Sequence, residues 1–282
     1  MLRESTTWLR LLALAPLVIA LTACGKSQAD KDAEAKEAAY REKYAKAEAL
    51  FKERCKTAGV VVKRTVRDVE GIELTKIRQP IPWGGKEYFD PMYPGAAMAG
   101  NSTGDRYVWQ FLQSEFRYSY APEQRGALGP PNYPSGYQQL DPTAGYRYVE
   151  YFDTKSGRWQ RCTAKRDAQS ARAFEDLMGC QLIKEPTSKY ALDYEDLIDP
   201  SDRALWVAGI KLKVIDKNSG EVIAELTKFV WDPGFGVRAT GRLPWEHAGS
   251  ALSTVCPSYP KRPHGSDSRY FIDTILEPKQ GE

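Results

Sequence analysis

The first part of the chain has the pattern of one long, water-exposed helix. Residues 26–56 contain no proline, alanine fills many positions, and acidic residues repeatedly precede basic residues by four positions. Alanine is the best helix former, and acid-before-base pairs at this spacing stabilise a helix. The main apolar feature is a stripe at helical spacing, which we expect to pack on the rest of the protein. Its members are Tyr40, Tyr44, Ala47 and Phe51.

After Gly59 the period of the apolar positions changes from that of a helix to that of β-strands. The segments with β-branched or alternating apolar residues are residues 60–62, 72–75, 146–152, 159–164, 180–184, 190–194, 210–214 and 222–226. The first two of these segments suggest a hairpin. Two later pairs predict hairpins more directly, because Gly157 and Gly220 each end a polar turn between alternating strands.

Two long segments have the periodicity of neither element. Residues 79–105 and 118–143 are rich in proline, glycine and tyrosine. Loops of this length are usually functional or serve as linkers. A short helix is expected at residues 107–116, and a helix or a strand at residues 270–276. The predicted fold class is α+β, with an N-terminal helix packed on a mainly antiparallel sheet that carries long Gly/Pro/Tyr-rich loops.

Length and charge bound the function. The chain has 282 residues and a formal net charge of +3. Its first 23 residues contain Arg3, Arg10 and Glu4, so the remaining 259 residues carry a net charge of +2. This length suffices for one large domain with its own core. So small a positive surplus argues against nucleic acid as a partner, because nucleic-acid binding needs a concentrated basic face.

The N-terminus has the signature of a secreted protein. Basic residues precede an apolar run, residues 11–20, that is too short to span a bilayer, and small residues then precede Cys24. The sequence Leu-Thr-Ala-Cys at residues 21–24 resembles the lipobox of bacterial lipoproteins. The resemblance implies cleavage before Cys24, lipidation of its thiol and acylation of its new amine, which together hold a protein firmly on a membrane. An ordinary transmembrane anchor is the alternative.

The lipobox also sets the expected organisation of the chain. Residues 1–23 would be a signal peptide, residues 24–32 a lipid-linked tether, and residues 33–282 a single α+β periplasmic domain. Gly25 stands where an aspartate, in enterobacterial lipoproteins, favours retention in the inner membrane. The expected location is therefore the outer membrane, with the domain facing the periplasm.

The cysteines predict two disulfides. Five cysteines become four once Cys24 is lipidated, and the periplasm is oxidising. Three pairings of the four are possible. We favour Cys162 with Cys180, which closes a short loop. The second pair is then Cys55 with Cys256, which joins the start of the domain to its end.

Motifs for catalysis and for cofactor binding are few. Residues 100–104 match G-x-S-x-G around Ser102, but a nucleophile elbow needs a strand before the serine, and a Gly/Pro loop precedes this one. The carboxylates of residues 193–196 are expected in an exposed acidic turn. His247 and His264 lack the spacing of metal ligands. We therefore predict no enzyme activity, no cofactor and no metal ion.

Several short segments of the sequence resemble those of a family of small proteobacterial periplasmic lipoproteins. They lie at residues 51–55, 58–59, 69–72, 145–150, 207–209, 212–216, 220–222, 242–245 and 256–257. The resemblance covers nearly the whole chain after the lipobox. Some members of that family resemble immunity lipoproteins of type VI secretion, which neutralise antibacterial toxins such as phospholipases. The resemblance carries no catalytic residue over to this chain.

The two long loops are also rich in aromatic residues, the side chains that dominate binding hot spots. We expect partner-binding anchors there, with Trp83, Tyr93 and Tyr133 as candidates, whereas aromatics that fold inward over the sheet are the alternative. The hypothesis for function is a lipoprotein that binds a protein partner, such as a cognate toxin encoded nearby. The rival hypothesis is a structural envelope lipoprotein without a toxin-binding role.

Overall fold

The computed structural model describes residues 26–99, 103–112, 145–165, 178–238, 241–258 and 267–279. The chain divides into two compact units, Met1–Ala45 and Lys46–Glu282. Within the described residues, no helix combines the length and the apolar character needed to cross a membrane. The predicted signal peptide and Cys24 lie outside the described residues.

Helix α2 (Gln28–Cys55) confirms the predicted N-terminal helix and runs through both units. Its start at Gln28 makes residues 28–32, which were expected in the tether, helical. In the first unit, Arg41 forms the predicted ion pair with Glu37 at 2.8 Å. Tyr40 is exposed, so the prediction that the whole apolar stripe packs on the domain is wrong at its first position. The helix up to that point is polar on all sides, and nothing there favours burial.

The last turns of α2 belong to the second unit and pack as predicted. Ala47 and Phe51 are buried, and the ring of Phe51 lies 5.8 Å from that of Trp231. Arg54 Nε lies 2.7 Å from a carboxylate oxygen of Asp202. Contacts of both kinds, apolar and ionic, therefore fix the end of the helix within the second unit.

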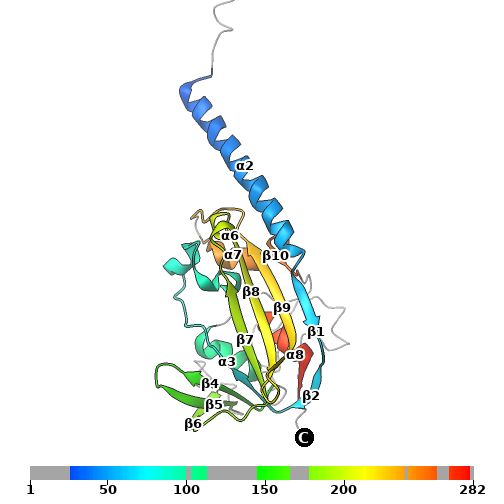
Figure 1. Ribbon diagram of the computed structural model, residues 1–282. Helices are drawn as coiled ribbons and strands as arrows, with labels where there is room; N and C mark the ends of the chain where they lie inside the picture. The colour runs from blue at the N-terminus through cyan, green and yellow to red at the C-terminus, as the bar shows by residue number, and fades with distance from the viewer. Residues whose placement is uncertain are drawn as a thin grey trace, which may run out of the picture. The chain divides into compact units, whose positions relative to one another are not determined.

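The second unit is built on a nine-stranded sheet (Figure 1). Eight strands follow one another in the order β1-β9-β8-β7-β3-β4-β5-β6, and β10 also pairs with β9. The strands are β1 (Gly59–Val62), β3 (Gly71–Leu74), β4 (Tyr148–Asp153), β5 (Arg158–Ala164), β6 (Met178–Ile183), β7 (Tyr190–Leu197), β8 (Val207–Asp216), β9 (Glu221–Trp231) and β10 (Val255–Cys256). Only β3 is parallel to its neighbours, β7 and β4, so the predicted α+β fold with a mainly antiparallel sheet is confirmed.

Two of the three expected hairpins are present. β8 and β9 pair across a turn that Gly220 closes at φ +73°, and β4 and β5 pair across a turn with Gly157 at φ +67°. The hairpin expected from residues 60–62 and 72–75 is wrong, since β1 pairs with β9 and β3 lies between β7 and β4. All four residues of β3 are buried, as is common for a central strand. Strand β2 (Val66–Val69), which lies between β1 and β3 in the sequence, pairs in parallel with β11 (Leu276–Pro278) in a separate two-stranded sheet.

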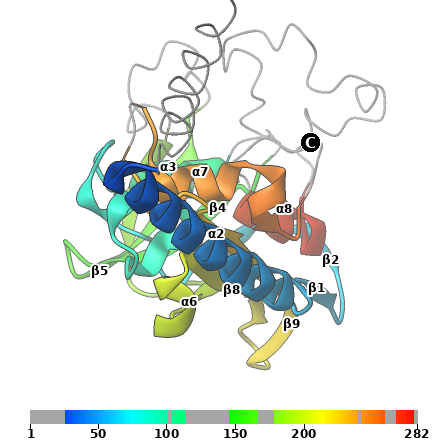
Figure 2. The same cartoon turned by 90° about the horizontal axis from the view of Figure 1, so that it is seen from above.

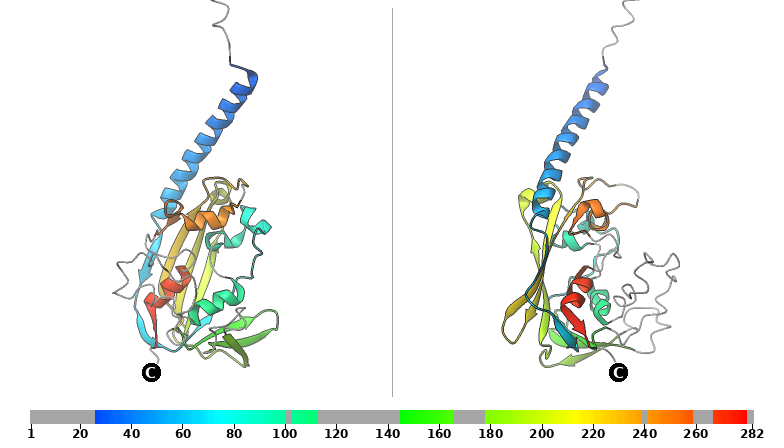
Figure 3. Two further views of the ribbon diagram at one scale, coloured as in Figure 1. Left: turned by 180° about the vertical axis from the view of Figure 1, so that it is seen from behind. Right: turned by 90° about the vertical axis from the view of Figure 1, so that its right-hand side faces the viewer.

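Helices α3 (Gly104–Leu112), α7 (Pro244–Ser250) and α8 (Asp267–Ile275) lie on one face of the large sheet (Figure 3), as the view from above also shows (Figure 2). Trp245, Phe111 and Phe271 from these helices are fully buried, together with Ile210 and Leu212 of β8. This face therefore holds the hydrophobic core. On strands β7 to β9 the alternate positions carry ion pairs, such as Lys213 with Glu195 at 2.7 Å.

The first long loop contains more regular structure than its composition suggests. Two 3-10 helices, η1 (Lys86–Phe89) and η2 (Pro94–Met98), form within residues 79–105, and the last four residues of η2 are buried. Two further short helices, α6 (Pro200–Ala204) and η5 (Leu252–Thr254), complete the described elements. The predicted short helix is α3 as far as Leu112, and residues 270–276 prove to be the end of a helix followed by a strand. Residues 118–143 lie outside the described part of the chain.

Both predicted disulfides are present. Cys55 at the end of α2 is bonded to Cys256 of β10, and Cys162 of β5 is bonded to Cys180 of β6. The second pair stands directly opposite in the register of two neighbouring strands. The first links residues 201 positions apart, so it closes most of the domain into one loop.

Candidate functional site

The structure separates the aromatic residues that the sequence put together as binding candidates. Trp83 is 76% exposed, the largest exposed fraction among the large hydrophobic residues described. Tyr93 instead packs against the core, and burial raises the pKa of its hydroxyl. Tyr133, the third candidate, lies outside the described residues. Of the first loop's two candidates, only Trp83 offers its ring to a partner.

Further exposed apolar side chains lie beside helix η1. The Trp83 ring is 6.3 Å from that of Tyr88 in η1, and Met92, three residues after the helix, is 44% exposed. Val237 is 61% exposed, and the guanidinium of its neighbour Arg238 lies 4.3 Å from the centre of the Phe89 ring in η1. We call Trp83, Met92 and Val237 the η1 surface.

A groove of about 780 Å³ lies between the start of α3 and strands β4, β5 and β6. Its walls are the segment that follows β3, as far as Pro80, and the start of α3 at Gly104. Side chains of β4, β5 and β6 form its floor, among them Tyr151, Gln160 and Met178. This volume matches that of small-molecule sites in proteins.

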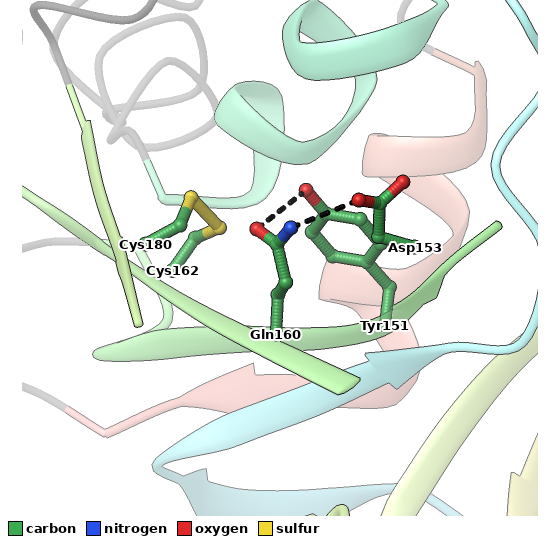
Figure 4. Close-up of a disulfide and its surroundings, with 5 residues drawn as sticks. All are labelled: Tyr151, Asp153, Gln160, Cys162 and Cys180. Carbon is green, nitrogen blue, oxygen red and sulfur yellow. Dashed lines mark hydrogen bonds between the residues drawn. A yellow bond between two sulfur atoms is a disulfide. The ribbon is translucent and has the colours of Figure 1, made fainter. Parts of the chain in front are cut away.

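A short hydrogen-bonded row crosses the floor of the groove (Figure 4). The Tyr151 hydroxyl donates to Oε1 of Gln160 at 3.3 Å, and Nε2 of Gln160 donates to Asp153 at 3.1 Å. Burial raises the pKa of Tyr151 to about 12. Hydrogen bonds from Ser156 and the Lys155 amide lower the pKa of Asp153. At neutral pH the row therefore offers a protonated phenol, an amide and a charged carboxylate, all suited to binding polar groups.

The disulfide stands at the end of this row, with Cys180 lining the groove and Cys162 buried beneath it (Figure 4). Within the described residues, no three potential metal ligands come together. The described residues before Ser102 form the 3-10 helix η2 rather than the strand of a nucleophile elbow, and Ser102 itself lies outside the described part.

The acidic residues 193–196 do not form the exposed turn that was expected. They lie in β7, and each carboxylate has a basic or hydroxyl partner. Asp193 accepts from Lys76 at 3.1 Å, and Asp196 lies 2.7 Å from Arg78, whose guanidinium stacks 4.7 Å from the centre of the Tyr194 ring. The prediction of a solvated acidic turn is wrong because β8 and the segment after β3 bring basic side chains to this strand.

Sequence reasoning missed the groove. Alternation along residues 146–152 indicated which side chains share a face, but the segment after β3 and the start of α3, which complete the groove, come from distant parts of the chain. Comparisons of the chain with protein-family models, with curated proteins and with solved structures found no match.

Proposed function

We propose that the protein is an outer-membrane lipoprotein, anchored through Cys24, that binds a protein partner in the periplasm at the η1 surface. The basic start, the short apolar run and the Leu-Thr-Ala-Cys sequence support the anchor. Two disulfides fit an oxidising compartment.

The exposure of Trp83 is the observation that supports partner binding most directly. A tryptophan side chain that is 76% exposed leaves a large apolar area in contact with water, an unfavourable arrangement that binding would relieve. Tryptophan is also among the residues most enriched at interface hot spots. Met92 and Val237 are further exposed apolar side chains close in sequence to residues that contact or form η1.

The partner we propose is a secreted antibacterial toxin, such as a type VI phospholipase, and the protein is its immunity factor. This step depends on the resemblance to immunity lipoproteins. An immunity protein acts by covering its toxin, so it needs a complementary surface and no chemistry of its own. A standard interface buries roughly 1,600 Å² in total, more than the η1 surface alone supplies, so neighbouring residues must contribute.

A genetic experiment tests the immunity role. The gene is deleted, and the strain is challenged by a sibling that still delivers the toxin encoded nearby. We expect loss of viability, rescued by the lipidated protein but not by a form kept in the cytoplasm. Unchanged survival of the deletion strain would favour a structural envelope lipoprotein instead.

A binding experiment tests the surface. Trp83→Ala should weaken binding to that toxin by at least about 2 kcal/mol, roughly thirtyfold, because it removes a central anchor. Leu182→Ala is the matched control, since Leu182 is 55% exposed but lies on edge strand β6, away from η1. Equal affinity of the two variants would exclude Trp83 as an anchor even if the immunity role holds.

A further inference from the structure

The edge strand β1 is the most exposed apolar strand in the described chain. β1 is the first strand of the large sheet and pairs with β9 on one side only. Val60, Val61 and Val62 are 43%, 66% and 46% exposed. Proteins usually protect such an edge, because its free N–H and C=O groups can pair with another chain.

The direction of the free hydrogen-bonding groups follows from the register. The Lys63 amide donates to the Ile223 carbonyl of β9 at 2.9 Å. Residues of a strand direct their main-chain groups alternately to the two sides, so Val61 also faces β9, whereas Val60 and Val62 face outward. Two N–H and two C=O groups thus point away from the sheet, without a partner in the described part of the chain.

The charges that would guard this edge are neutralised within the molecule. Lys63 is paired with Glu221 at 3.2 Å, and Arg64 forms an ion pair with Asp216. A lysine on an edge strand discourages association when its charge is free. The valine segment has no charge of its own, so only apolar side chains and main-chain groups meet an approaching strand.

We propose that a second copy of the protein pairs with this edge, β1 against β1 in antiparallel orientation, about a two-fold axis at Val61. The segment is self-complementary: Val60 then stands opposite Val62 of the second copy, and the four outward groups of each copy match those of the other. Isologous contacts of this kind are the commonest in homodimers. The dimer would join the two large sheets into one.

The side chains fit the same arrangement. Val60 and Val62 stand opposite Leu226 and Ala224 of β9, on the core face of the sheet. In the dimer they meet the same two valines of the second copy and continue the apolar layer across the axis. On the other face of the sheet, Val61 stands directly opposite Val61 of the second copy. The two residues form a non-hydrogen-bonded pair, so their Cα atoms are roughly 4.5 Å apart.

This geometry predicts a specific cross-link. Two cysteines directly opposite at about 4.5 Å can form a disulfide, as Cys162 and Cys180 do between β5 and β6. The full chain carrying Val61→Cys is oxidised in the membranes of producing cells and run on a non-reducing gel. We expect a species of twice the mass that reducing agent converts to monomer, and peptide mapping should join the two introduced thiols.

Val60→Cys is the matched control, because it is one residue away and similarly accessible. Its thiol would be diagonal to its equivalent, roughly 7–8 Å away, too far for a disulfide without backbone movement. The unsubstituted chain reports any linkage that does not involve the introduced thiol. Equal cross-linking of the Val61→Cys and Val60→Cys variants, or no cross-linking of the first, would overturn the proposed dimer.

A measurement of mass in solution provides the second test. The detergent-solubilised full chain should change from dimer to monomer when Val61→Lys places two like charges opposite each other at the axis. Val61 is exposed, so the variant should still unfold in one cooperative thermal transition, which would show that it folds. An unsubstituted chain that is monomeric at every concentration, or a variant that stays dimeric, would contradict pairing through β1.

Discussion

Glu150 offers the sharpest test of how the large sheet is stabilised. Its side chain is fully buried in β4, yet it accepts six hydrogen bonds. Oε1 accepts from Arg161 Nε at 2.9 Å, from Arg161 Nη2 at 2.5 Å and from the Thr187 hydroxyl at 3.2 Å. Oε2 accepts from the Thr187 amide at 2.9 Å, and from the amide and hydroxyl of Ser188 at 2.7 and 2.6 Å. The carboxylate thereby joins two strands and the connection that leads to β7.

The substitution Glu150→Gln keeps the shape but replaces one acceptor oxygen with an NH₂ group. If the NH₂ group takes the place of Oε1, it faces both nitrogens of Arg161, and if it takes the place of Oε2, it faces the amides of Thr187 and Ser188. These donors are fixed in direction and cannot rotate away. A buried donor without an acceptor costs about 1–3 kcal/mol, and Arg161 can recover part of this loss in water because its side chain is 25% exposed. We expect a loss of about 3 kcal/mol in the free energy of unfolding at pH 7.

The pH dependence follows from the same contacts. Burial by itself raises the pKa of Glu150, but the hydrogen bonds from Ser188, Arg161 and Thr187 outweigh burial and hold the pKa below its ordinary 4.5. Because its pKa is lowered on folding, the Glu150 carboxylate stabilises the folded protein fully above pH 4.5. This stabilisation is lost as the pH falls through the pKa that Glu150 has in the folded protein. The difference between Glu150→Gln and the unsubstituted protein should therefore narrow on acidification.

Urea denaturation at pH 7 and at stepwise lower pH measures both effects. Glu195→Gln is the matched control, because Glu195 lies in the same sheet, has one partner, Lys213, and is 54% exposed. Exposed ion pairs contribute up to about 1 kcal/mol, so this control should lose little stability. Equal losses for the two variants, or a Glu150→Gln loss that does not depend on pH, would refute the proposed role of the buried carboxylate.

Three further predictions concern the anchor, the disulfides and the groove. Metabolic labelling with a fatty-acid analogue should mark the native protein and not Cys24→Ala, and equal labelling of both would exclude the lipid anchor. Replacing Cys55 and Cys256 by alanine should destabilise the domain by about 5 kcal/mol, because their disulfide links residues 201 positions apart and so closes a long loop. A loss of stability near zero in urea denaturation would contradict this. Tyr151→Phe removes the hydroxyl that donates to Gln160, so the protein should lose about 1 kcal/mol of stability. A melting curve that shows a loss several times larger would mean that the groove floor depends on this hydrogen bond.

Local sequence signals predicted the elements whose formation depends on neighbouring residues. The alanine-rich, charge-paired segment is helix α2, and the glycines at positions 157 and 220 end the turns of two hairpins. In both hairpins the paired strands are adjacent in sequence, so turn chemistry and alternation suffice to set the register. The number of cysteines and the expected compartment predicted two disulfides, and the favoured pairing is confirmed.

The tertiary structure decided the features that depend on distant residues. Residues 60–62 and 72–75 have strand composition, but nothing near them in sequence shows that β3 becomes a buried central strand and β1 an edge. For the same reason residues 193–196 have the composition of an acidic turn, and only pairing with β8 and with the segment after β3 supplies their basic partners. Exposure of Trp83 and partial burial of Tyr93 likewise depend on how η1 and η2 pack. Residues in one loop share composition and local propensity, whereas burial depends on contacts with residues far away in the chain.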